Sequence, residues 1–125
     1  MRGWPVLSRG MFERGPLTAY EEMLRAVTPH RVDGTAVTTS AEAMTAIAEA
    51  LSFPERFGHN LDALYDCLTD LSWLPPGEHV LVWSEPSVLS GADRPAYDAI
   101  RTVLSDAVSD GTPQEAFLSV LLLTD

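Results

Sequence analysis

The sequence predicts an α/β fold, with a small three-stranded parallel sheet, crossover helices and an extra N-terminal helix. Two stretches, 79–84 and 116–123, are nearly all apolar and have the length of strands that are buried on both faces of a sheet. Amphipathic helical patterns separate the candidate strands along the chain. Strands that alternate with helices in this way pair in parallel through right-handed crossovers.

The first 29 residues are expected to form an N-terminal extension ahead of one domain over residues 30–125. Glycine and proline are frequent up to about residue 17, which predicts an irregular arm. Thr18 and Glu21 have the spacing of a capping box for a short helix, and Pro29 would end that helix. A brief strand over His30–Val32 follows.

Two amphipathic helices are expected next. Thr39 and Glu42 repeat the capping-box spacing, and apolar residues then recur at helical intervals up to Leu51. Asn60 is a suitable N-cap for a further helix with a stripe of leucines, which the run Pro75-Pro76-Gly77 stops.

The last part of the chain is expected to hold two strands and one helix. His79–Ser84 has the length of a buried strand, and a loop with Pro86, Gly91 and Asp93 follows it. Pro95 suits the first turn of a helix that ends near Gly111. Ala116–Leu123 forms the last strand.

The composition favours a basic protein partner. The chain of 125 residues has a net charge of −10, and all eight of its basic residues are arginine. Such a surface repels nucleic acid and anionic membranes and attracts cationic proteins. One cysteine excludes an internal disulfide, and neither a secretory signal nor a membrane-spanning stretch is evident. We therefore expect a cytoplasmic protein that is monomeric when free.

Three aspartates at steps of four, Asp62, Asp66 and Asp70, are expected to share one face of the helix after Asn60, since each step turns by only about 40°. Like charges at this spacing destabilise an isolated helix. The row is therefore either a solvated acidic face or a surface for a cationic partner. A general acid–base pair or a site for a hard cation is a further alternative.

The run from Phe53 to Thr69 resembles the signature of the barstar family, the intracellular inhibitors of barnase-type ribonucleases. The matching residues are Pro54-Glu55, Phe57, Gly58-His59-Asn60-Leu61-Asp62-Ala63-Leu64, Tyr65 and Asp66-Cys67-Leu68-Thr69. A looser resemblance covers about residues 30–125. It implies a barstar-like fold and no enzymatic activity, cofactor or metal.

The resemblance implies inhibition of a secreted, basic, guanyl-preferring ribonuclease, in which a carboxylate takes the place of substrate phosphate. Asp66 would be inserted most deeply, with Asp62 beside it. The other partner-binding residues that we expect are Tyr65, Thr69, Asn60, Leu61, Gly58, Arg56, Phe57, Asp70, Asp106 and Asp110.

Arg56 stands where the prototype of the family carries a tyrosine that stacks on the catalytic histidine of the nuclease. A guanidinium at this position either repels a basic active site or pairs with a carboxylate of the partner, and we favour the pair. The alternative function is a barstar-like interaction module that inhibits no nuclease.

Overall fold

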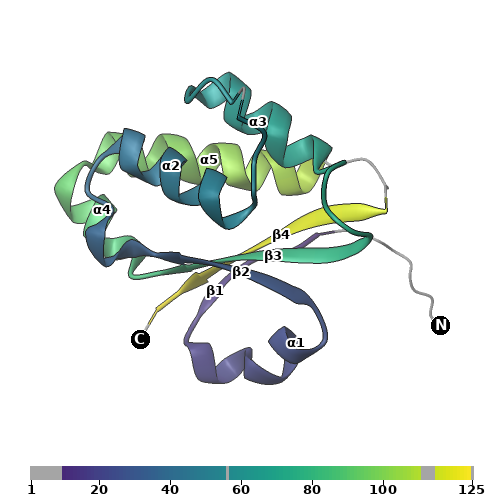
Figure 1. Cartoon of the computed structure of the whole chain (residues 1–125). Coiled ribbons are helices and arrows are strands. Elements are labelled where there is room, and N and C mark those ends of the chain that lie inside the picture. Colours follow the sequence, from purple (N-terminus) through teal and green to yellow (C-terminus); the bar gives the residue numbers. More distant parts are fainter. Residues whose placement is uncertain (1–9, 56, 111–114, 125) are drawn as a thin grey trace.

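The fold is built on a four-stranded, all-parallel sheet in the order β1-β4-β3-β2 (Figure 1). The computed structural model describes residues 10–55, 57–110 and 115–124. The strands are β1 (Phe12–Gly15), β2 (Thr28–Asp33), β3 (Gly77–Ser84) and β4 (Ala116–Leu123). The helices are α1 (Glu21–Arg25), α2 (Ser40–Ala50), α3 (Leu61–Asp70), α4 (Pro86–Ala92) and α5 (Arg94–Asp110), with 3₁₀ turns at Leu17–Ala19 and Gly34–Ala36. The α/β class and the parallel pairing are therefore confirmed.

The expectation of three strands is wrong, because part of the supposed N-terminal arm forms a fourth strand, β1, at the edge of the sheet. Phe12 pairs with Val120 of β4, and a hydrogen bond from Thr124 N to Gly15 O (2.8 Å) fastens the other end. The segment Phe-Glu-Arg-Gly is too short and too polar to show the alternation by which strands are recognised. The boundary of an N-terminal extension stays a prediction, although β1 belongs to the same sheet as the other strands.

Helices cover the two faces of the sheet unequally: α2, α3, α4 and α5 lie on one face, and the short α1 lies on the other (Figure 1). The larger core, on the first face, includes Ile47, Leu64, Leu81, Trp83 and Leu104. The smaller cluster, beneath α1, consists of Leu24, Val80, Val82 and Leu121. Strands β3 and β4 are thus buried on both faces, as their apolar runs predict.

The capping box predicted at Thr39 is present, whereas the one predicted at Thr18 is not. Thr39 Oγ1 accepts a hydrogen bond from Glu42 N (3.0 Å) at the start of α2. Thr18 lies in a 3₁₀ turn, and α1 begins after Tyr20 without a side-chain cap among the described residues. Pro29 does not end α1 but lies within β2, where an edge strand tolerates a residue that lacks an N–H group.

α4 lies where a loop was expected, because Pro86 and Gly91 interrupt the apolar pattern. Pro86 occupies the first helical position, where the missing N–H group costs no hydrogen bond. Asp93 then links α4 to α5, since its Oδ1 accepts from Ala96 N at 3.1 Å. Pro95 lies in the first turn of α5, as predicted, and Gly111, the expected end of this helix, lies outside the described residues.

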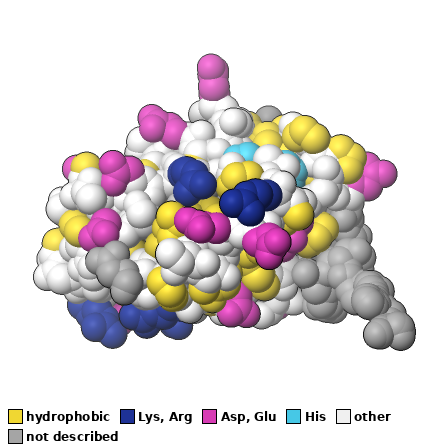
Figure 2. Space-filling model, turned by 90° about the horizontal axis from the view of Figure 1, so that it is seen from below, with side chains coloured by type: hydrophobic (Ala, Val, Ile, Leu, Met, Phe, Trp, Pro, Cys, Tyr) yellow, Lys and Arg dark blue, Asp and Glu magenta, His cyan; other side chains and the backbone are white. Residues whose placement is uncertain are grey.

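The α1 side of the molecule carries charges of both signs (Figure 2). The exposed arginines of α1 and β2 are Arg25 and Arg31, and Glu21 and Glu22 of α1 are exposed as well. In the part of the chain that the structure describes, no helix has the length and apolar character needed to cross a membrane.

Candidate functional site

The residues that the sequence singles out lie mainly on α3 and on the loop before it, where Asn60 starts the helix. Asn60 Oδ1 accepts a hydrogen bond from Ala63 N at 2.8 Å, which satisfies a donor of the first turn and confirms the predicted cap. The preceding residue, His59, has a φ of 53° in the left-handed region. This turn at His59, next to the exposed Gly58, sets the direction in which the chain enters α3.

Asp62, Asp66 and Asp70 are all exposed on α3, while two leucines on the opposite side of the helix, Leu64 and Leu68, are buried. The carboxylates therefore point away from the core. Within the described residues the only ion pair lies on α5, so no cation from this part of the chain neutralises the row. Among the described residues, the row is therefore a helix face whose carboxylates form no ion pair.

A hydrogen bond between Tyr65 and Asp110 joins α3 to α5 at this surface. Tyr65 Oη donates to Asp110 Oδ2 at 2.8 Å, although the two residues are 45 positions apart in the sequence. This bond raises the pKa of Tyr65 above its ordinary value near 10, and the charges of Asp110, Asp106 and Asp66 act in the same direction, because they disfavour the phenolate. The structure thus gathers the carboxylates of Asp66, Asp106 and Asp110 around one phenol.

Two other predicted contacts lie on the same helix. Leu61, in the first turn, is 36% exposed and is one of the two large hydrophobic residues exposed in the described part of the chain. Thr69 Oγ1 donates within the helix, to Tyr65 O (3.0 Å) or Asp66 O (3.2 Å). Its hydroxyl is therefore occupied in the free protein, and a contact with a partner stays a prediction.

In the loop before α3, the predicted contact residue Phe57 is buried, unlike the exposed aspartates of α3. Phe57 packs its ring edge-on against Phe53, with 5.0 Å between centroids. It therefore supports the loop from inside instead of presenting its ring to solvent. Arg56, the residue that departs most clearly from the family pattern, lies outside the described residues.

A hollow of about 210 Å³ lies beside the aspartate row. Its lining residues are Pro54, Phe57, Gly58, Ala63, Asp66, Cys67, Asp70 and Trp73. Trp73 is held beside this hollow by a hydrogen bond from its Nε1 to Leu51 O (2.9 Å), 22 residues away. The hollow combines aromatic walls with carboxylates, a combination that suits a cationic side chain.

The surface can accept hydrogen bonds from cations through the exposed carboxylates of Asp62, Asp66 and Asp70. No group of three or more histidine, cysteine, aspartate or glutamate residues in the described ranges could hold a metal ion. The hydroxyls of Tyr65 and Thr69 both donate to oxygen acceptors of the protein. The exposed carboxylates of α3 remain acceptors for charge-assisted hydrogen bonds from a cationic partner.

Comparisons with known proteins agree with the sequence signature. The family model described as Barstar (barnase inhibitor) matches residues 27–122. No match is found among curated proteins. One solved chain, in a structure of Drosophila ORC bound to AT-rich DNA and Cdc6, aligns with a TM-score of 0.49 and 15% identity over 93% of this chain. The match spans 41% of that longer chain, and a likeness this low bears on neither activity nor partner.

Proposed function

Since the chain belongs to the barstar (barnase inhibitor) family, we propose that it inhibits a basic, secreted, barnase-type ribonuclease. In this proposal the acidic face of α3 enters the active site of the nuclease and occupies the position of substrate phosphate. The protein acts as a monomer in the cytoplasm and performs no reaction of its own.

The observation that carries the proposal is the group of carboxylates around Tyr65. Asp66 projects from the middle of α3, and the Tyr65–Asp110 hydrogen bond holds α3 against the C-terminal end of α5. A ribonuclease binds phosphate with arginine, lysine and histidine side chains, and these donors form charge-assisted hydrogen bonds with a carboxylate as well. Because both helices are already packed together, little ordering is needed on binding.

The negative charge on α3, which forms no ion pair within the described part of the chain, also favours a cationic partner. Asp62 and Asp70 lie one turn on either side of Asp66, at a spacing where like charges repel each other. A partner that places cations opposite the row relieves this repulsion. The same charges accelerate the encounter of the two proteins.

The decisive experiment is an inhibition assay with a barnase-type ribonuclease and four purified variants. Asp66→Ala should weaken inhibition most, by at least about a hundredfold, because it leaves cations of the nuclease desolvated and unpaired. Asp62→Ala should weaken it less, and Asp106→Ala least. The matched control is Glu22→Ala, which removes one negative charge from α1 on the opposite face of the sheet and should inhibit like the parent protein.

Two results would contradict the proposal. If Asp66→Ala inhibits as well as the parent, the α3 carboxylate does not replace phosphate. If the parent binds the nuclease without lowering its activity, the protein is an interaction module and not an inhibitor.

A further inference from the structure

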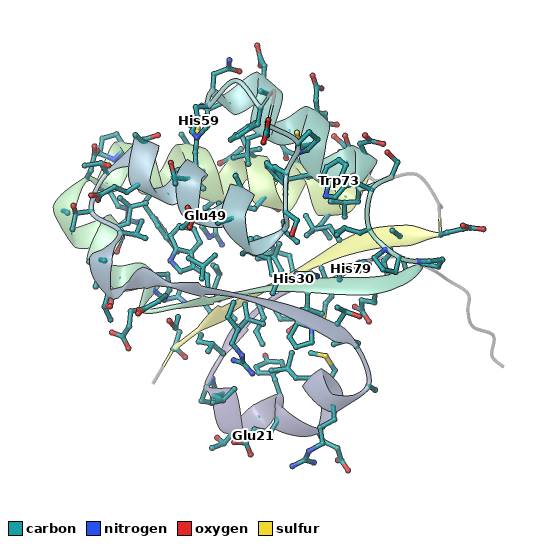
Figure 3. The ribbon with its side chains drawn as sticks, in the orientation of Figure 1. Glu21, His30, Glu49, His59, Trp73 and His79 are labelled. Atoms are coloured by element: carbon teal, nitrogen blue, oxygen red, sulfur yellow. The ribbon has the colours of Figure 1, made fainter. Side chains whose placement is uncertain are left out.

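Two histidines from neighbouring strands, His30 of β2 and His79 of β3, contact each other on the helix-covered side of the sheet (Figure 3). His30 Nε2 lies 2.9 Å from His79 Nδ1. The outer nitrogens of the pair face backbone carbonyls: His30 Nδ1 lies 2.9 Å from Ala50 O, and His79 Nε2 lies 2.6 Å from Pro75 O. His79 is 1% exposed, so water cannot readily replace these partners.

The number of protons on the pair follows from these contacts. A carbonyl oxygen only accepts hydrogen bonds, so both outer nitrogens must carry a proton. The contact between the inner nitrogens of His30 and His79 needs one further proton, which one ring donates to the lone pair of the other. Three protons on two imidazoles leave one positive charge on the pair. A fourth proton would set one N–H group against another and break the contact.

The surroundings explain why one charge is accommodated and a second is opposed. Ala50 is the last residue of α2, where the negative end of the helix dipole favours a cation. Burial, and then the charge on His79, lower the pKa of His30 below its ordinary value near 6.5, while the hydrogen bond to Ala50 works against them.

Charged side chains near the pair do not bond to it. Glu49 on α2 is exposed, and Arg31 and Glu78 neighbour the two histidines in their strands, so their side chains point to the opposite face of the sheet. Glu78 accepts a hydrogen bond from Ser119 Oγ. Among the described residues, no carboxylate hydrogen bonds to either ring.

The two carbonyls bound by the pair flank the segment that carries the candidate site. Ala50 precedes and Pro75 follows a stretch that contains the loop, α3 and the hollow. At the end of α2, Phe53 N bonds to Ala48 O and Ser52 N bonds to Glu49 O. The carbonyls of Ala50 and Leu51 are left for side chains, and His30 and Trp73 supply the donors. The histidine pair therefore fastens both ends of this segment to the sheet.

We propose that the His30–His79 pair is a proton-dependent clamp, which holds the segment from Leu51 to Leu74 in place while it carries one charge and releases it in acid. When the segment opens, the rings separate and each one takes up its own proton. Opening is therefore favoured as the pH falls below about 6.5, the ordinary pKa of histidine. The link from the clamp to inhibition rests on the proposed function; the clamp itself does not.

The first test needs no variant. Long-range ¹H–¹⁵N spectra of the full chain, recorded between neutral and mildly acidic pH, report the protonation of each ring nitrogen. We expect three of the four ring nitrogens of His30 and His79 to carry protons while the two rings are in contact. Two protonated nitrogens instead of three would overturn the proposal.

The second test measures hydrogen exchange of backbone amides in α3 and in β3, corrected for the intrinsic effect of pH. The equilibrium constant for opening of α3 should rise relative to that of β3 as the pH falls. The total rise should be about tenfold for each unit by which the pKa for adding a second charge to the closed pair lies below 6.5. His30→Gln should abolish this difference. His59→Gln, which removes the exposed third histidine, should retain it. An equal rise in α3 and β3 would refute a local clamp.

A third measurement separates the clamp from the proposed function. The affinity for a barnase-type ribonuclease should fall on acidification more for the parent than for His30→Gln. If the protein binds no ribonuclease at any pH, the proposed function fails, while the first two tests still decide on the clamp. If it binds with the same pH dependence in both proteins, the clamp does not act on the site.

Discussion

Replacing Asp66 by alanine is expected to make the free protein more stable, although Asp66 is the residue that we place deepest in the partner. The side chain of Asp66 is exposed, so the replacement removes no buried contact. It ends the repulsion with Asp62 and Asp70, each one turn away. It also puts the best helix former in the middle of α3.

The expected gain follows from these two effects. Each like-charge pair at this spacing costs about 0.2–0.5 kcal/mol. Aspartate in a helix interior is less favourable than alanine by up to about 0.7 kcal/mol. We expect the free energy of unfolding to increase by about 1 kcal/mol, which for a chain of this length corresponds to a rise of about 4 °C in Tm.

The measurement is urea unfolding at 25 °C and thermal unfolding of the parent, Asp66→Ala and Asp66→Asn. Asp66→Asn removes the charge but keeps a poor helix former, so it isolates the repulsion and should give about half of the gain. That part should shrink in high salt, which screens exposed charges. If Asp66→Ala unfolds at a lower urea concentration than the parent, Asp66 makes a stabilising contact and the reasoning fails.

Four further outcomes can be checked. Association with a basic ribonuclease should slow as salt is added, because screening weakens the attraction; an unchanged rate would contradict this. Asp110→Asn should lower the pKa of Tyr65, as measured by phenolate absorbance. In the parent, the stability that comes from the Tyr65–Asp110 hydrogen bond should be complete below about pH 10 and lost at higher pH, because Tyr65 of the unfolded chain ionises first. Inhibition should persist in EDTA, because no step depends on a metal; loss that a divalent cation restores would contradict this. Arg56→Tyr should weaken binding to the natural partner if a carboxylate lies opposite Arg56, and tighter binding would disprove that pair.

The sequence predicts the elements whose signals are local. Asn60 caps α3 and Thr39 caps α2 as their spacings predict, and the apolar runs become the buried strands β3 and β4. β1 escapes prediction because a four-residue edge strand needs only one partner strand and little apolar surface. α4 escapes it because Pro86 and Gly91, which usually interrupt helices, lie at tolerated positions in a short one.

The candidate site is predictable in its residues and not in its contacts. The row of Asp62, Asp66 and Asp70 can be derived from helical spacing alone. The bond from Tyr65 to Asp110 depends on how α3 packs on α5, which no local pattern encodes. No local pattern predicts the contact between His30 and His79 either, because these two residues lie 49 positions apart in the sequence.

The pairing of β1 with β4 has a consequence for the way the chain is made. Met11 and Ser119, hydrogen-bonded at this edge, are 108 positions apart, so β1 leaves the ribosome long before its partner is translated. β2 and β3 can pair earlier, but one edge of β3 then stays open until β4 is inserted between β3 and β1. Pairs of residues this far apart in the sequence raise the contact order, and folding slows as contact order rises. A chain that stalls before β4 therefore exposes the edge of an apolar strand, β3, to pairing with other chains.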